Sequence, residues 1–302
     1  MRGRYISAWL FQNKGAESMS NAFPRTMVGG VSLPKMLIGS NWLVGYSHTS
    51  TASDEMIRDH HTRRETIAEV IEAYLEYGID AMMGLMVQSP ILVDAAKLAE
   101  DRTGKKVILI DTPILNVDDS TAARDEARRM IEASRKAGST FCLPHHSSVE
   151  QLVSKNRRQI DRLPDYLEMI RENGMVPGLS AHMPELIVYS DLNEYDVETY
   201  VQIYNCLGFL MQVEVEYIHK VIHAAKKPVM SIKAMAAGRV SPFVGLTFSY
   251  CTLRSQDMVT VGAFTPAEVH EDVEIALSAL EGRAPRIKGR QSPKVTDAMR
   301  QG

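Results

Sequence analysis

The chain has 302 residues, of which 45% are hydrophobic and 24% charged, and its formal net charge is −3. These are the proportions of an ordinary globular protein, and the length suits one large domain. The near-neutral charge gives no electrostatic reason to expect binding to nucleic acid or to an anionic membrane surface, and no apolar run approaches the roughly 20 residues of a membrane helix. We therefore expect a small-molecule substrate as the partner, and a homo-oligomer is compatible with this composition.

Three cysteines, Cys142, Cys206 and Cys251, are scattered along the chain without Cys-x-x-Cys spacing. An odd number of isolated cysteines argues against a disulfide framework and against a structural zinc site. It favours a reducing compartment, so we expect a cytoplasmic protein.

The N-terminal residues differ from the rest of the chain. They contain one brief apolar patch, YISAWLF, which is short for the apolar region of a secretory signal and is not promptly followed by a small-residue cleavage site. We interpret residues 1–26 as a leader or a disordered extension outside the fold. A weak secretory signal is the alternative, and Met19 and Met27 are alternative starts.

From Lys35 onward one unit recurs: a short apolar, β-prone run followed by an amphipathic helical stretch. Residues 63–78 show the helical pattern, with apolar side chains on one face and Gly78 as a stop. Ser89 and Thr265 are helix caps, each followed by a proline in the first helical turn. Residues 149–173 predict a long polar helical region that Pro164 interrupts. The eight β-prone runs are 35–40, 79–84, 106–111, 139–143, 175–180, 197–205, 228–233 and 257–262.

Eight strand-plus-helix units over about 250 residues are what a (β/α)8 barrel requires. The near-continuous apolar strands suit a parallel sheet that is buried on both faces. A doubly wound open sheet is the alternative, but no glycine-rich phosphate turn follows the first strand. We therefore predict an α/β fold, a single-domain TIM barrel over residues 27–282, with a loose C-terminal tail over residues 283–302.

The C-terminal strand ends of such a barrel form one ring that carries the chemistry. Asp111, His145 and His182 follow three neighbouring strands. One carboxylate and two imidazoles could bind a divalent metal such as Zn, Mn or Mg and leave positions open for water or substrate. Without a metal, the same groups could act as a general acid and base with an orienting carboxylate. Asp111 precedes Thr-Pro and could instead be an ordinary turn residue.

Other side chains are expected around the same mouth. Burial among apolar neighbours would lower the pKa of Lys233 and make it a base or a Schiff-base amine. His145 directly follows Pro144 at a strand end and is expected in the mouth, unless it only caps the next helix, whereas His146 is expected to face the loop. The predicted substrate-binding residues are Asn41, His48, Tyr204, Asn205 and Arg239.

Four further histidines have weaker claims to function. His60 and His61 lie in a charge-rich segment and are expected on the surface. His219 and His223 are one helical turn apart, so they could bind a metal together, but we expect them on the outer face of a helix.

The segments YVQIYN, KKPVMSIKAMAAGRVSP and DMVTVGAFTPAEVHEDVEIAL resemble the sixth to eighth βα units of the aldo-keto reductase superfamily. GLSAHMPE resembles its fifth unit, and His145 falls where the family keeps its active-site histidine. This resemblance covers residues 139–280 and implies NADP(H) as a cofactor. It implies that Tyr204 stacks on the nicotinamide and that Gly262, Ala263 and Thr265 approach the cofactor phosphates.

The chain departs from the family before residue 139. The reductases carry an aspartate at the end of the second strand, a tyrosine shortly after it and a lysine at the end of the third. Here these places read AMMGLMVQSP and ILIDTP, with Asp111 in place of the lysine. The segment after Gly262 also lacks the basic residues that hold the 2′-phosphate of NADP.

Three functions are compatible with these residues. The first is a non-redox isomerase or lyase that removes a proton next to the carbonyl group of a small sugar, polyol or hydroxy-carbonyl compound. In it, His145 and His182 act as acid and base or as metal ligands, Asp111 as a ligand or orienting group, and Lys233 polarises the carbonyl. The second is an NAD(P)H-dependent reductase with a rearranged proton donor. The third is a catalytically inactive barrel used as a binding module.

Overall fold

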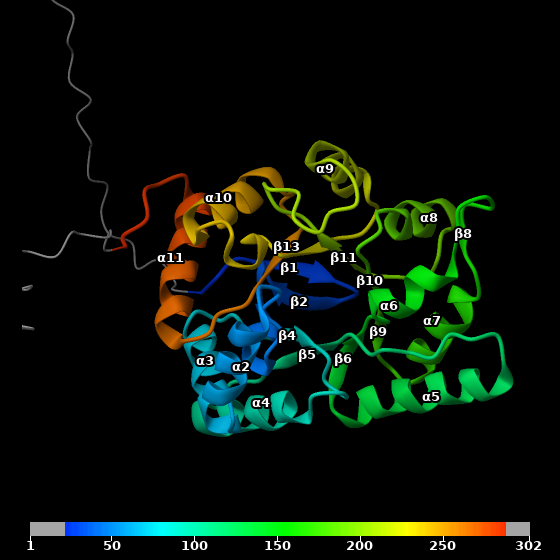
Figure 1. Cartoon of the computed structure of the whole chain (residues 1–302), viewed down its shortest axis with the longest axis horizontal. Helices are drawn as coiled ribbons and strands as arrows, with labels where there is room; N and C mark the ends of the chain where they lie inside the picture. Colours follow the sequence, from blue (N-terminus) through cyan, green and yellow to red (C-terminus); the bar gives the residue numbers. More distant parts are fainter. Residues whose placement is uncertain (1–21, 288–302) are drawn as a thin grey trace, which may run out of the picture.

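The strands of the computed structural model, which describes residues 22–287, form one main parallel sheet with helices around it (Figure 1). The sheet order is β10-β11-β12-β13-β3-β4-β5-β6-β9, so that chain neighbours are also sheet neighbours. This arrangement confirms the predicted (β/α)8 barrel. The strands are β3 (Met36–Gly39), β4 (Ala81–Gly84), β5 (Ile108–Asp111), β6 (Ser139–Cys142), β9 (Val176–Pro177), β10 (Leu179–Ser180), β11 (Tyr200–Ile203), β12 (Val229–Ile232) and β13 (Met258–Val261).

The sheet contains nine strands because the fifth predicted strand is divided at Gly178. Its first part, β9, pairs with β6, and its second part, β10, pairs with β11. A Cβ atom on Gly178 would lie 2.8 Å from the carbonyl oxygen of Thr199 and 2.9 Å from the side chain of Leu143. Glycine therefore permits the close backbone approach through which this broken strand closes the ring.

The helices follow the strands as the periodicity predicts. Ser120 and Thr265 cap two of them through side chains that accept the backbone N–H groups of Ala123 and Glu268. The helices are α1 (Asn41–Val44), α2 (Thr51–His60), α3 (Arg64–Glu76), α4 (Pro90–Thr103), α5 (Thr121–Lys136), α6 (His146–Val149), α7 (Leu163–Glu172), α8 (Glu185–Asn193), α9 (Val215–Ala224), α10 (Pro242–Thr252) and α11 (Pro266–Glu281).

The predicted helical region over residues 149–173 is wrong in its first half. After α6 and one short 3-10 turn, the chain forms a hairpin of β7 (Val153–Ser154) and β8 (Gln159–Ile160). Pro164 lies in the first turn of α7, where its missing N–H costs nothing, so it begins a helix instead of interrupting one.

An N-terminal hairpin closes the end of the barrel at which the strands begin. It consists of β1 (Arg25–Val28) and β2 (Val31–Pro34), and Val28 and Leu33 pack against the side chains inside the barrel. Phe23 is also buried, with its ring centroid 6.0 Å from that of Tyr250. The predicted boundary at residue 26 is therefore too late, and residues 1–21 of the predicted leader lie outside the described residues.

The C-terminal boundary also extends beyond the prediction. Arg283 pairs with Glu274 and Glu281, and Ile287 packs against the core. The remainder of the predicted tail, residues 288–302, lies outside the described residues.

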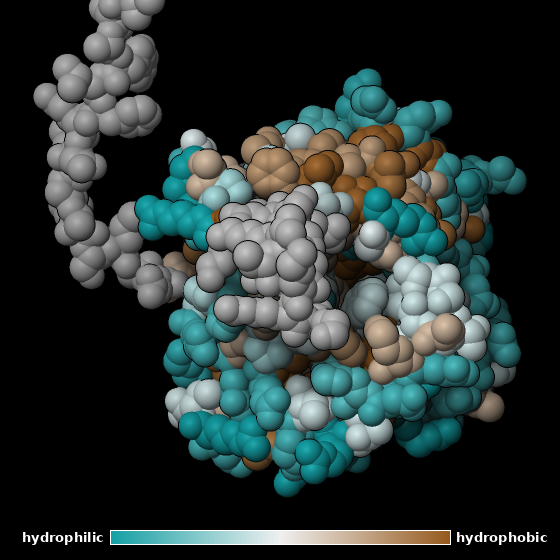
Figure 2. All heavy atoms as spheres, turned by 60° about the vertical axis from the view of Figure 1, so that its left-hand side comes forward, coloured by the Kyte–Doolittle hydropathy of each residue, from teal (hydrophilic) through white to brown (hydrophobic). Residues whose placement is uncertain are grey.

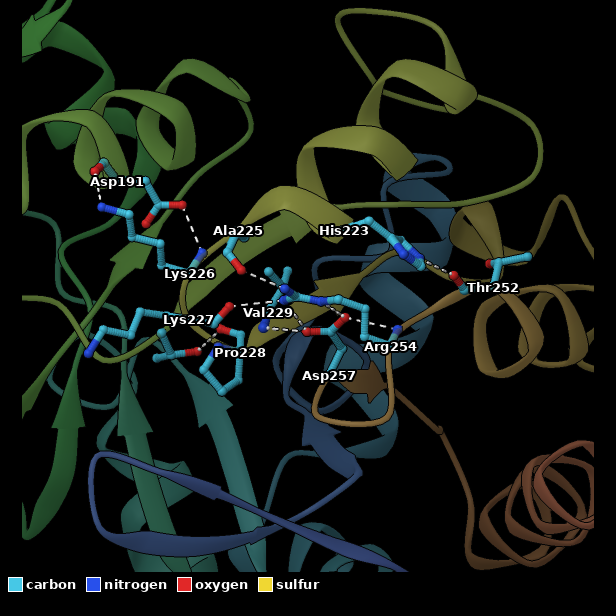
Figure 3. Close-up of polar contacts among 11 residues, drawn as sticks. Asp191, His223, Ala225, Lys226, Lys227, Pro228, Val229, Thr252, Arg254 and Asp257 are labelled. Carbon is cyan, nitrogen blue, oxygen red and sulfur yellow. Dashed lines mark hydrogen bonds and ion pairs between the residues drawn. The ribbon is translucent and has the colours of Figure 1, made fainter.

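Polar contacts connect the N-terminal ends of β12 and β13. Asp257 accepts the backbone N–H of Val229 at 2.9 Å, and Arg254 donates to the carbonyl oxygens of Ala225 and Lys227 at 2.6 and 3.0 Å (Figure 3). These contacts lie at the ends of the two strands opposite to those at which the chemistry of a (β/α)8 barrel is found.

The face of the molecule in Figure 2 is largely hydrophilic but carries an apolar area, shown in brown in the upper part of the view. Phe243 and Val244 of α10 are half-exposed, while Leu246 of the same helix is buried. Among residues 22–287, the helices are too short or too polar to cross a membrane.

Candidate functional site at the C-terminal end of the barrel

A cavity of about 440 Å³ lies at the C-terminal ends of the strands, a volume that suits a small molecule. Its wall brings together six of the residues predicted from the sequence, which are Asn41, His48, His145, His182, Lys233 and Gly262. His146 lines it as well, and no aspartate or glutamate is among the lining residues of the described chain.

Three imidazoles lie side by side in this wall. The ring of His146 stacks on that of His182 with centroids 3.7 Å apart, and its centroid is 4.2 Å from that of His145. The expectation that His146 faces away into the loop is therefore wrong. His145 caps α6, and its Nδ1 lies 2.7 Å from the hydroxyl of Ser147. Both histidines that follow a strand thus reach the cavity, because the short helix α6 starts at the strand end.

The environment keeps two of these imidazoles neutral. Burial, and then the neighbouring His146, lower the pKa of His145 to about 4 and that of His182 to about 3. A neutral imidazole can accept a proton or a metal ion, so both side chains are ready for either role at physiological pH.

Glu150 is a site residue that the sequence reasoning missed. Its Oε1 accepts the backbone N–H groups of His182 and Met183 at 2.6 and 2.8 Å, and its Oε2 lies 3.7 Å from Nδ1 of His146. Burial raises the pKa of this carboxyl, but the nearby imidazole of His146 and the hydrogen bonds from the two N–H groups lower it further than burial raises it. Ligand atoms of His146, Glu150 and His182 all lie within 4.8 Å of one another. The helical spacing of His146 and Glu150 was a signal for this pair.

Lys233 follows β12 and extends into the cavity. Its Nζ lies 3.1 Å from Nε2 of His48, which is also 3.1 Å from Nδ2 of Asn41. Burial lowers the pKa of Lys233 to about 8, as the sequence predicts for a lysine among apolar neighbours. Arg239, which was predicted to bind substrate, is not among the residues that line the cavity; its guanidinium is 3.4 Å from the carbonyl oxygen of His48 and stacks over Phe209.

Asp111 does not reach the cavity, so its predicted role as a metal ligand is wrong. It is fully buried between β5 and α5, where it accepts the backbone N–H of Met86 at 2.8 Å and the hydroxyl of Ser134. Burial raises its pKa to about 6, although the hydrogen bonds to the carboxylate oppose this rise. Asp111 is a structural acceptor that holds the loop after β4.

We expect Asp111→Ala to lower the free energy of unfolding by about 2–4 kcal/mol, because it leaves a buried N–H and a buried hydroxyl without their acceptor. Asp111→Asn keeps an acceptor oxygen and should cost less. Denaturant unfolding measures both values. If Asp111→Ala had the same free energy of unfolding as the wild-type protein, the structural role of Asp111 would be contradicted.

Tyr204 and Asn205 also lie outside the cavity. Val201 lines it, and because side chains alternate along a strand, Tyr204 falls on the outer side. Its hydroxyl is 3.0 Å from Oγ1 of Thr252 and its ring packs against Phe248. Asn205 is buried and accepts two backbone N–H groups of its own loop. Their predicted roles in substrate binding, and that of Tyr204 in nicotinamide stacking, are wrong.

Of the residues predicted to approach cofactor phosphates, only Gly262 lines the cavity. Ala263 is buried in the core, and Thr265 caps α11. Oε2 of Glu268 accepts the N–H of Phe264 at 2.7 Å, so that a carboxylate occupies the start of this helix. Negative charge there opposes a phosphate at the same place.

The remaining histidines lie away from the cavity. His61 is buried, contrary to expectation, because its Nε2 contacts the carbonyl oxygen of Phe264 at 3.1 Å and fixes the loop before α11. His223 on α9 contacts the carbonyl oxygen of Thr252 at 2.9 Å (Figure 3). The centroid of the His219 ring on the same helix lies 4.1 Å from that of the His223 ring.

Searches with family models and with curated proteins give no match to this sequence. Among solved structures, the chain is similar to a Pseudomonas aeruginosa protein described as an aldo-keto reductase, with a TM-score of 0.63, 15% identity, and coverage of 88% of this chain and 100% of that one. The match to an aldo/keto reductase of Klebsiella pneumoniae, solved with NADP and acetate, has a TM-score of 0.56 and 14% identity. It covers 90% of this chain and 99% of that one. The match to Rubisco from Pyrococcus horikoshii has a TM-score of 0.50 and 11% identity, and it covers 74% of this chain and 57% of that one. The chain is thus a divergent barrel with the fold of the aldo-keto reductases.

Proposed function

We propose that the chain is an enzyme of the isomerase or lyase type, which acts on a small sugar, polyol or hydroxy-carbonyl compound by moving a proton next to its carbonyl group. The observation that carries this proposal is the meeting of His145, His182 and Lys233 in one cavity at the active end of the barrel. Enolisation of a carbonyl compound needs a base and a group that stabilises the oxyanion, and two neutral imidazoles and one cationic amine can fill these roles.

Each of these side chains has a role that follows from its surroundings. One neutral imidazole accepts the proton from the carbon next to the carbonyl group, and the second exchanges a proton with the oxygen. The Nδ1 of His145 is engaged with Ser147, so its Nε2 is the atom available for this transfer. Lys233 donates to the carbonyl oxygen, on which negative charge grows as the proton leaves.

A divalent metal ion fits the donor set of His146, Glu150 and His182. Two imidazoles and one carboxylate suit Zn²⁺ or Mn²⁺ better than Mg²⁺, which prefers oxygen ligands. The ligand atoms of these three side chains are separated by up to 4.8 Å, so the stacked rings of His146 and His182 would have to move to share one ion. A bound ion would supply a Lewis acid for the carbonyl oxygen; His182 would then be a ligand, and His145 would be the imidazole left for proton transfer.

The metal site has a direct test. We expect chelator-treated protein that is reloaded with Zn²⁺ and desalted to retain one ion per chain by elemental analysis. Glu150→Gln and His146→Ala should abolish retention, because each removes a ligand. His145→Ala is the matched control and should retain the ion. Loss of the ion from His145→Ala but not from Glu150→Gln would contradict this assignment, and no retention by the wild-type protein would leave the histidines to metal-free acid and base catalysis.

An NAD(P)H-dependent reductase with a rearranged proton donor is the second candidate. The shared fold with a reductase that was solved with NADP favours it. The outward position of Tyr204 and the carboxylate of Glu268 at the start of α11 weigh against it. A catalytically inactive binding module is the third, and the gathering of three imidazoles and a lysine in one cavity argues against it.

The proposed reaction can be tested with a panel of small hydroxy-aldehydes, hydroxy-ketones and sugar acids, monitored by NMR without nucleotide. We expect isomerisation or cleavage of at least one compound. Reduction of a panel member only in the presence of NADPH would instead support the reductase.

A further inference from the structure

Lys233 brings a positive charge into the cavity without a carboxylate partner. Its polar contact among residues 22–287 is Nε2 of His48, whose pKa is lowered by burial and then by Lys233 itself, so this partner is neutral. No aspartate or glutamate of the described chain lines the cavity. A half-buried cation without a counter-ion is costly, and an anionic ligand would remove that cost.

The turn that follows Lys233 has an unusual backbone. Ala236, Ala237 and Gly238 have φ values of 49°, 55° and 80°, and Lys233 itself has a φ of 62°. A left-handed conformation costs roughly 1–2 kcal/mol for each residue other than glycine. Tight packing holds the turn, because a Cβ atom on Gly245 of α10 would lie 2.6 Å from the carbonyl oxygen of Ala234. Strain of this kind is often found at ligand sites.

This turn also contains backbone N–H groups that have no acceptor in the described part of the chain and belong to residues lining the cavity. The N–H groups of Ala236 and Gly238 bond to carbonyl oxygens of the turn at 2.8 and 3.0 Å. Those of Ala234, Met235 and Ala237, all of which line the cavity, have no acceptor in the described part of the chain. Backbone N–H groups gathered at a turn beside a lysine are a common way to bind an anion.

We propose that the substrate carries an anionic group, a phosphate or a carboxylate, which binds between Lys233 and the backbone N–H groups of residues 234–237. The ammonium has three donors, of which one faces His48. The other two can donate to the anionic group of the substrate and to the carbonyl oxygen next to it. That the anion belongs to a substrate rests on the proposed function, whereas the anion site itself does not.

The site can be tested with two simple probes, inorganic phosphate and malonate. Thermal unfolding is followed at constant ionic strength, with sodium chloride as the reference salt. We expect one of the probes to raise Tm in a saturable way, because a ligand that binds the native state stabilises it. The response to phosphate alone assigns a phosphorylated substrate, and the response to malonate alone assigns a carboxylated one. Equal, non-saturable effects of all three salts would overturn the proposal.

Variants assign the response to the site. Lys233→Met should abolish it, and Lys233→Arg, which keeps the charge, should retain a weaker one. Lys227→Met is the matched control, since Lys227 pairs with Glu198 outside the cavity, and it should respond like the wild-type protein. Ala237→Gly keeps the N–H group and relieves left-handed strain, so it should respond as well and unfold at a higher temperature. A full response in Lys233→Met would overturn the proposal.

The anion site and the proposed reaction can fail separately. Saturable binding of an anion without turnover of any carbonyl compound would keep the site and remove the reaction. Turnover of neutral hydroxy-carbonyl compounds at the same kcat/KM as their phosphorylated or carboxylated analogues would keep the reaction and overturn the proposal that the substrate binds through an anionic group.

Discussion

His182→Ala is expected to lower the rate of proton transfer by about 10²–10⁴-fold, the usual contribution of a positioned acid or base. The ring of His182 lies against His146 in the cavity wall, and its low pKa keeps it neutral at physiological pH. The rate is measured as kcat/KM for isomerisation or cleavage of the active panel compound.

A matched control separates this effect from a general loss of structure. His219→Ala removes an imidazole from the outer helix α9 and should leave kcat/KM within about twofold. The two variants should unfold at similar temperatures. Wild-type activity in His182→Ala would show that this imidazole is not an acid or base of the reaction.

Asp272→Asn is expected to stabilise the protein by roughly 2–4 kcal/mol at pH 8. Asp272 lies on α11 and is buried close to Tyr74 and Tyr250. Burial, and then the neighbouring Glu268 and Glu271, raise its pKa to about 8 from an ordinary value of 3.8. The unfolded chain therefore loses this proton near pH 4, while the folded chain keeps it until about pH 8.

The sign of the pH dependence follows from these two values. Between about pH 4 and pH 8 the folded state binds more protons than the unfolded state, so this group makes stability fall as the pH rises. Asparagine cannot ionise, and Asp272→Asn should remove that slope and be most stabilising at the upper end. Urea unfolding at several pH values measures it, with Glu271→Gln on the exposed side of α11 as the control. Equal slopes for Asp272→Asn and the wild-type protein would contradict the assignment.

The barrel was predictable because each strand corresponds to a short apolar run that can be recognised from neighbouring residues alone. The run KVILID is apolar and ends in a polar residue, and β5 occupies its last four positions. The cap at Thr265 and the proline after it mark the start of α11 to the residue. The division of the fifth strand was not predictable, because Gly178 is required by a close approach to Thr199, which begins the neighbouring βα unit of the sheet.

The candidate site was predictable only in part, since a strand end can point in two directions. His145, His182 and Lys233 face the cavity as predicted, whereas Asp111 and Tyr204 face the surrounding helices. A shift of one residue along the strand turns a side chain from the cavity to the surrounding helices. The sequence pattern does not determine that direction for the last residue of a strand. Glu150 reaches the site from the turn after α6, and its contact with the backbone of the next βα unit depends on the tertiary fold.

The central claim is that this cavity moves protons and not hydride. The most direct measurement is the incorporation of deuterium from D₂O next to the carbonyl group of the anionic hydroxy-carbonyl compounds in the panel, followed by NMR without nucleotide. We predict exchange with the wild-type protein and its loss in His182→Ala. The absence of exchange in every compound, together with NADPH-dependent reduction of one of them, would contradict the claim and identify the barrel as a reductase.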